Sequence, residues 1–184
     1  MLLDFVATFF GGSMLLMPIF ADQILAVGPR GLGVLYAAQP VGAALAGFFM
    51  SARGVPRRQG MAVLVSVAAY GAAIAVFGVS RSFALSLVAL AASGAADTVS
   101  MVIRQTLRQL LTPDELRGRM TSINMMFYIG GPQLGEFEAG AVARAFNARI
   151  SVVSGGVLCA AAVLVTALVA PALRRYEGAH PPQP

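Results

Sequence analysis

The sequence predicts an all-α membrane protein with six transmembrane helices. Hydrophobic residues make up 58% of the 184 residues and charged residues only 11%, less than half the charged share of a usual soluble domain. The apolar residues form long blocks instead of periodic stripes. A spanning helix needs about 20 mostly apolar residues. Six blocks meet this length, at 2–21, 31–52, 60–79, 83–107, 119–144 and 150–173.

Short segments rich in turn-forming or charged residues separate the blocks. The first block, MLLDFVATFF onward, lacks the basic start of a signal peptide, so we expect a spanning helix there. The connections are VGPRG (27–31), RGVPRRQG (53–60), SRS (80–82), TPDELRGR (112–119) and FNAR (146–149). Connections this short predict that neighbouring helices run antiparallel. We assign residues 1–176 to one transmembrane domain and the proline-rich residues 177–184 to a disordered cytoplasmic tail.

The arginines predict the orientation in the membrane. The net charge is +5 and the chain has no lysine. If the amino terminus lies inside, eight arginines fall on the inner side, namely Arg53, Arg57, Arg58, Arg108, Arg117, Arg119, Arg174 and Arg175. Three fall outside, namely Arg30, Arg81 and Arg149. The positive-inside rule therefore places both termini in the cytoplasm, with the chain in the inner (plasma) membrane. No motif for reading nucleic acid is present, so we expect membrane lipid as a partner and no nucleic acid.

Small residues within the blocks predict close contact between helices. Gly131 and Gly135 are four residues apart, and further small residues occur at Gly42, Ala46, Gly94, Gly140, Gly155 and Gly156. In lipid, such positions let helix backbones approach one another. Pro18, Pro40 and Pro132 lie inside blocks and permit kinks.

The segment TPDELRGR gathers charges between two apolar blocks. Thr112 and Glu115 have the spacing of a capping box, with Pro113 at the first helical position. The residues that we assign to this loop motif are Pro113, Asp114, Glu115, Arg117, Gly118 and Arg119. The acids would begin a helix and the arginines would hold its start on the cytoplasmic side. We interpret the segment as a capped hinge and not as an active site.

Polar residues inside the fourth block are candidates for a transport cavity. A charge near the bilayer centre costs about 2.5–3.5 kcal/mol on insertion scales, so such residues usually face a cavity or a partner. Five polar residues recur at helical spacing on one face, namely Ser93, Asp97, Ser100, Arg104 and Arg108. We expect this stripe to form a polar wall, with Asp97 as a proton-coupling candidate.

The fifth block carries two more acids. Glu136 and Glu138 are two positions apart and therefore lie on different helix faces. Gln133, Glu136 and Gly140 share one stripe. At least one glutamate should point inward, as a proton carrier or substrate contact. The alternatives are a structural ion pair or a surface position.

Two segments resemble a known family. GFFMSARGVPRR (47–58) is similar to a loop of the major facilitator superfamily in Gly47, Gly54, Arg57 and Arg58, although Ser51 and Ala52 replace an acid and a base. The segment 97–140, which contains PDELRGR and LGEFEAG, closely resembles helices ten and eleven of the drug and siderophore efflux branch, which includes enterobactin-exporter-like proteins.

The resemblance implies a secondary active transporter of twelve helices, of which this chain matches the carboxy-terminal six as one half of the bundle. It implies proton-coupled efflux of small amphipathic compounds or siderophores, with substrate bound near the midplane between two halves. We therefore expect a fragment whose partner is a missing amino-terminal half. The alternative is a non-transporting membrane interaction module or an inactive truncated remnant. Because Cys159 and His180 are isolated, we expect no metal site, no cofactor and no enzyme activity.

Overall fold

The described part of the protein is a bundle of long helices. The computed structural model describes residues 9, 14–54, 56 and 58–169. Three short pieces come first, η1 (Met14–Leu16), α2 (Met17–Ile19) and η2 (Phe20–Ile24). The longer helices are α3 (Gly28–Arg53), α4 (Gln59–Val79), α5 (Phe83–Leu111), α6 (Arg117–Ala145) and α7 (Ala148–Val169), with η3 (Asp114–Leu116) before α6. Within these residues the chain forms no strand, so the predicted all-α class is confirmed.

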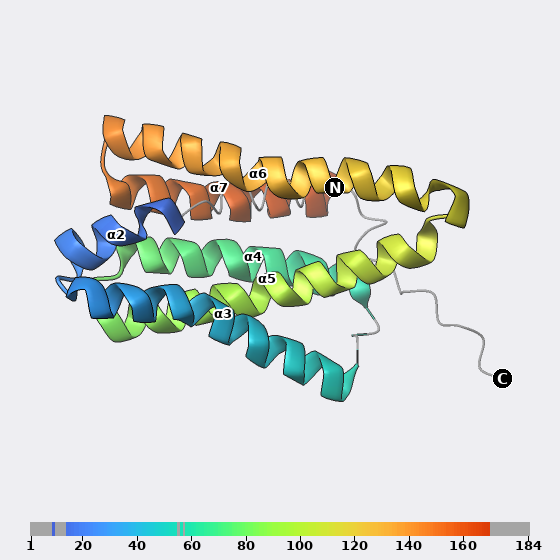
Figure 1. The fold of residues 1–184 in the computed structure, drawn as a ribbon, viewed down its shortest axis with the longest axis horizontal. Coiled ribbons are helices and arrows are strands. Elements are labelled where there is room, and N and C mark those ends of the chain that lie inside the picture. The colour runs from blue at the N-terminus through green and yellow to red at the C-terminus, as the bar shows by residue number, and fades with distance from the viewer. Residues whose placement is uncertain (1–8, 10–13, 55, 57, 170–184) are drawn as a thin grey trace.

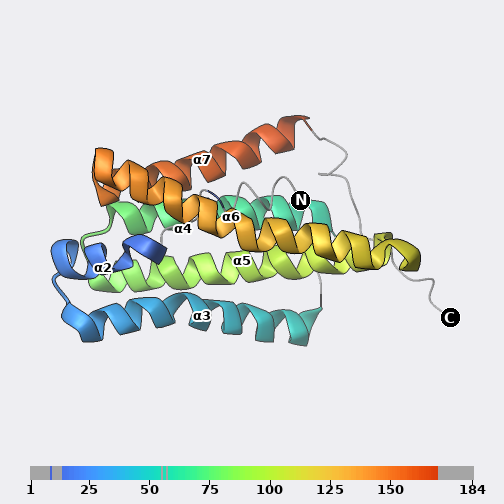
Figure 2. The ribbon, with the colours of Figure 1, turned by 45° about the horizontal axis from the view of Figure 1, so that its top comes forward.

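The long helices pack in an order that differs from their order in the sequence. Helix α4 contacts α5 on one side and α7 on the other, α3 packs against α5, and α6 packs against α7. Figures 1 and 2 show this arrangement, and the short segment η1 contacts α6. Successive long helices run in opposite directions (Figure 1), as the short connections predict.

Within the described residues, four helices, α3, α4, α5 and α7, are long and apolar enough to cross a membrane. Helix α6 has 29 residues but is more polar and is not among these four. The predicted blocks 31–52, 60–79, 83–107 and 119–144 fall within α3 to α6. Helix α3 begins at Gly28, earlier than predicted, because Pro29 fits the first turn of a helix.

The first and last predicted blocks lie partly outside the described residues. Of the block 2–21, residues 2–8 and 10–13 are not described, and the described part continues in a helical conformation to Ile24. The end of the last block, 170–173, and the tail 177–184 are also outside this range. A division into six spans therefore stays a prediction.

Glycines allow the closest approaches between helices. A Cβ atom at Gly42 of α3 would collide with the backbone of Ala91 of α5, and one at Gly94 would collide with the backbone of Gln39. On the other side of the bundle, a Cβ at Gly156 of α7 would lie 2.6 Å from the carbonyl oxygen of Gly71. The prediction that small residues mark helix contacts is confirmed at these positions.

Local sequence explains where several helices bend, end or begin. Figure 1 shows α3 turning away from α5 in its second half, after Pro40. The helix ends at Gly54, whose φ of 77° is costly for other residues and whose amide donates to the carbonyl oxygen of Met50. At the start of α7, the amide of Ile150 donates to Oδ1 of Asn147 at 2.8 Å, an N-cap in the FNAR connection.

The predicted capping box in TPDELRGR is wrong. Thr112 is the C-cap of α5, with its backbone amide bonded to the carbonyl oxygen of Arg108. The N-cap of η3 is Pro113, and no side chain caps that turn. Thr112 therefore ends one helix instead of beginning the next. The acid that engages a partner is Asp114, whose carboxylate lies 2.9 Å from Arg117.

Candidate functional site

Asp97 occupies the middle of α5. The helix runs from Phe83 to Leu111, so fourteen residues lie on each side of the acid. At 1.5 Å per residue, the carboxylate-bearing position is about 21 Å along the axis from either end. If α5 crosses a bilayer, Asp97 therefore lies inside the hydrocarbon core, where an acid is costly.

The polar stripe of α5 faces the interior of the bundle. Ser93 and Ser100 are 0% and 1% exposed, while Asp97 and Arg104 are half-buried. The hydroxyl of Ser93 donates to the carbonyl oxygen of Leu90 at 2.7 Å. The hydroxyl of Ser100 has no hydrogen-bond partner among the described residues. The structure thus places the polar stripe inside the bundle, and the buried hydroxyl of Ser100 lies about one turn from Asp97.

Asp97 lies within electrostatic range of groups from two other helices, Tyr70 of α4 and Cys159 of α7. Cys159 is 1% exposed and its sulfur lies 4.0 Å from the carbonyl oxygen of Val67. The acid on α5 is therefore near α4 and α7, the two helices that pack against each other beside it.

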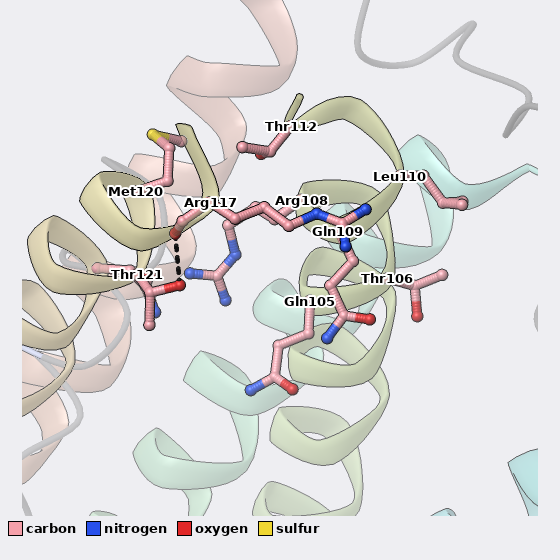
Figure 3. A pocket seen from close by; sticks show the side chains of 10 residues that line it. Gln105, Thr106, Arg108, Gln109, Leu110, Thr112, Arg117, Met120 and Thr121 are labelled. Carbon is pink, nitrogen blue, oxygen red and sulfur yellow. Dashed lines mark hydrogen bonds between the residues drawn. The ribbon is translucent and has the colours of Figure 1, made fainter. Parts of the chain in front are cut away.

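A cavity of about 640 Å³ lies where α5 ends and α6 begins. Figure 3 shows side chains of both helices around it, with Arg108 and Gln109 from α5 and Thr121 from α6. Its lining consists of Gln105, Thr106, Arg108, Gln109, Leu110, Thr112, Arg117, Met120, Thr121 and Asn124. The lining has two guanidinium groups and no carboxylate. Arg117 already pairs with Asp114, so Arg108 is the lining cation that suits an anionic or hydrogen-bond-accepting group.

The cavity and the polar stripe share Arg108. Starting at Ser93, the stripe passes through Asp97, Ser100 and Arg104 and reaches the cavity at Arg108. This continuity connects the middle of α5 to the end of the bundle that the arginine count predicts to be cytoplasmic.

The candidates on α6 lie on separate faces. Gly135 and Ala139 form the buried side of this helix, and Gly135 approaches the backbone of Phe9. Glu136 and Glu138 flank that side and are both half-buried, whereas Gln133 is exposed. Neither glutamate lines the cavity at the start of α6.

Most of the loop motif residues that the structure describes lie on its surface. A Cβ at Gly47 or Gly118 would meet nothing within 4 Å, so neither marks a close contact. Arg58 is the exposed N-cap residue of α4, and Arg57 lies outside the described residues. Pro113, Asp114, Glu115, Arg117, Gly118 and Arg119 are all exposed.

Sequence reasoning missed most of the cavity lining. Gln105 and Gln109 are four residues apart on α5, a spacing that indicates one helix face. The predicted polar wall lies on a different face, the one that carries Asp97, and therefore did not include them. Thr121 and Asn124 lie beyond the charged connection and carry no motif. Among the described residues, no group of three or more His, Cys, Asp and Glu side chains could hold a metal ion.

Comparisons with known proteins give a consistent result. Residues 4–180 match the family described as transmembrane secretion effector. The enterobactin exporter EntS of Shigella flexneri is 29% identical over 182 residues, which is 98% of this chain and 44% of that protein. The enterobactin exporter EntS of Citrobacter koseri is 29% identical over 150 residues, or 82% of this chain and 36% of its own length. The chain thus spans less than half the length of these relatives. No solved structure matches it.

Proposed function

Because this chain belongs to the transmembrane secretion effector family of the major facilitator superfamily, we propose that it forms the carboxy-terminal half of a proton-coupled exporter. Its substrates would be small amphipathic compounds or siderophores. The names of the relatives, enterobactin exporters, support a siderophore as the first substrate to test. The partner would be an amino-terminal six-helix half, since transporters of this kind bind substrate between two halves.

The observation that carries the proposal is the acid at the middle of α5. Insertion of Asp97 costs about 2.5–3.5 kcal/mol on translocon scales, and an apolar residue there would avoid that cost. The position lies on the buried face with Ser93 and Ser100, two side chains that are almost fully enclosed. An ionisable group kept inside a membrane helix at such a cost is typical of proton relays.

In the proposed mechanism, protonation of Asp97 changes the preferred arrangement of the bundle. The charged acid favours the state in which it faces water or a cation, and the neutral acid tolerates the closed state. A proton taken up from outside would therefore bias the equilibrium toward one state, and its release inside would reset it. Glu136, half-buried on α6, is the second candidate proton carrier.

The cavity between α5 and α6 supplies the polar exit in this scheme. Arg108 belongs both to the polar stripe and to the lining, so charge changes at Asp97 are connected to the cavity by one helix face. The surplus of arginines at this end supports a cytoplasmic position, with both termini inside and the chain in the inner membrane.

A chimera tests the transport function. The amino-terminal half of the Shigella flexneri exporter is joined to this chain, and enterobactin uptake is measured in inverted vesicles with an imposed proton gradient. We expect uptake that depends on the gradient, and a loss of about tenfold or more in Asp97→Asn and in Glu136→Gln. Asp22→Asn is the matched control, because Asp22 is an exposed acid outside the long helices and outside the loop motifs.

Unchanged uptake in both acid variants would refute the proton-carrier assignment. An inactive chimera with normal membrane insertion would favour the alternative of a non-transporting module.

A further inference from the structure

A second groove lies at the opposite end of the bundle, between α4 and α7. It has a volume of about 450 Å³ and is lined by Gly78, Val79, Arg81, Arg149, Ile150, Val153, Ser154 and Val157. This groove belongs to the end where α4 stops and α7 begins, away from the cavity beside Arg108. It plays no part in the proposed transport route.

Two guanidinium groups stand at the mouth of this groove. Arg81 is exposed in the connection between α4 and α5, and Arg149 is half-buried in the first turn of α7. Neither forms an ion pair with a carboxylate in the part of the chain that the structure describes. The Nε atom of Arg149 is buried without a hydrogen-bond partner there. Two such groups match a phosphate, which arginine binds through paired N–H donors.

Apart from the arginines and Ser154, the groove is lined by apolar residues and Gly78. Val79, Ile150 and Val157 are 66%, 46% and 54% exposed. Ser154 is the one hydroxyl residue of the lining, and its side chain already donates to the carbonyl oxygen of Ser151 at 3.0 Å. A ligand in this groove therefore has a charged end at the arginines and an apolar body below them.

Exposed apolar stripes continue from the groove along both helices. On α7, Val157 and Leu164 are seven residues apart, and Leu164 is 65% exposed. On α4, Val79 and Val65 are fourteen residues apart, and both are more than half exposed. Residues seven apart stay within about 20° of one helix face, so each stripe runs straight. Fourteen residues cover about 21 Å, more than the roughly 15 Å of one leaflet of the hydrocarbon core.

We propose that this groove binds an anionic phospholipid, with the phosphate between Arg81 and Arg149 and the acyl chains along the exposed stripes of α4 and α7. Charge complementarity at the mouth and an apolar path of leaflet length favour a diacyl lipid over a free anion. Basic pockets between transmembrane helices bind anionic headgroups on the cytoplasmic side of membranes, and the predicted orientation places this groove in the outer leaflet. The site is independent of transport and would be occupied in an inactive chain as well.

The test is lipid binding to the 184-residue chain in nonionic detergent, followed by native mass spectrometry. The two probes are palmitoyl-oleoyl phosphatidylglycerol and palmitoyl-oleoyl phosphatidylcholine, which have the same acyl chains. An arginine near the membrane surface contributes about fivefold to anionic lipid affinity, so we expect a preference of about 25-fold for phosphatidylglycerol. In Arg81→Gln/Arg149→Gln the preference should fall to about twofold or less.

Arg30→Gln is the matched control. Arg30 is an exposed arginine in the first turn of α3, at the same end of the bundle but outside the groove. The control should keep the full preference for phosphatidylglycerol. If it loses as much as the double variant, general surface charge explains the binding and the proposal fails. If circular dichroism shows that the double variant does not fold, Arg81→Gln alone replaces it, because Arg81 is at an exposed position. Its preference for phosphatidylglycerol should fall about fivefold.

Soluble competitors distinguish a lipid site from an anion site. Glycerophosphoglycerol and inorganic phosphate carry the headgroup chemistry without acyl chains. We expect neither to displace phosphatidylglycerol at a hundredfold molar excess. Displacement by either one at an equal concentration would overturn the lipid assignment, and so would a double variant that keeps the preference.

Discussion

Replacing Gly42 with alanine should separate α3 from α5. A Cβ atom at residue 42 would lie 2.6 Å from the carbonyl carbon and 2.8 Å from the Cα of Ala91. Unstrained carbon atoms stay about 3.5–4.0 Å apart. Both clashing atoms belong to a helix backbone, so no side-chain rotation relieves the contact. The two helices must move apart by about 1 Å to restore this separation.

The size of the effect follows from that movement. A gap of about 0.5–1 Å forfeits a quarter to a half of each dispersion contact along the crossing, and overpacking of this kind typically costs about 1–3 kcal/mol. The new methyl group also raises helix propensity by about 1 kcal/mol in a soluble helix. Gly47→Ala gains the same propensity on the same helix, and its Cβ would meet nothing within 4 Å. The difference between the two variants therefore isolates the clash, at about 1–3 kcal/mol.

The chain provides its own reporter for the measurement. Cys159 is the single cysteine and is 1% exposed. A maleimide dye that fluoresces on reaction therefore reports the opening of the bundle during heating in detergent. We expect Gly42→Ala to release Cys159 at a clearly lower temperature than Gly47→Ala.

Equal melting of the two variants would refute the close crossing of α3 and α5. A further check is Gly94→Ala, whose Cβ would collide with the backbone of Gln39 at the same crossing. Once the helices have separated, the second clash costs less, so the double variant should lose less stability than the sum of the single ones.

Three other substitutions give distinct expectations in the same thermal assay. Gly54→Ala forces a side chain into the φ of 77° and ψ of 179° at the end of α3, a conformation that is essentially restricted to glycine, and we expect a loss of about 1–3 kcal/mol; an unchanged melting temperature would contradict this positive-φ C-cap. Ser151→Ala removes the 2.8 Å hydrogen bond from Ser151 to the carbonyl oxygen of Ala139, which joins α7 to α6, and should cost about 1 kcal/mol; Ser154→Ala, which loses a bond within α7, is its control. Asp114→Asn should change stability by less than about 0.5 kcal/mol, because Asp114 and Arg117 are both largely exposed; a larger loss would mean that this pair fixes the connection between α5 and α6.

Much of the helical architecture follows from residues that act locally. Pro29 and Gly54 delimit α3, and the apolar content of α4 and α7 marks them as spans before any fold is known. These features depend on one helix at a time, so composition and breakers reveal them. The predicted capping box was wrong because spacing alone does not show where the preceding helix ends. Thr112 has the spacing to begin a helix, but its amide bonds backward to Arg108, and that choice depends on where α5 ends.

The candidate site was only partly predictable. Helical spacing placed Ser93, Asp97 and Ser100 on one face, and the structure buries the two serines almost completely. The cavity beside Arg108 needs α5 and α6 to diverge while α6 packs against α7, and no spacing within one helix encodes that divergence.

The sequence by itself determined that the chain is helical, that it suits a membrane and that an acid lies within its fourth apolar block. These properties are set by hydropathy and by local backbone preference, which each segment carries alone. Only the tertiary structure decided which helices touch, that Asp97 of α5 lies near α4 and α7, and that Arg81 and Arg149 line one groove. Those outcomes depend on contacts between residues far apart in the chain, which form where glycines such as Gly42 and Gly156 let two backbones approach.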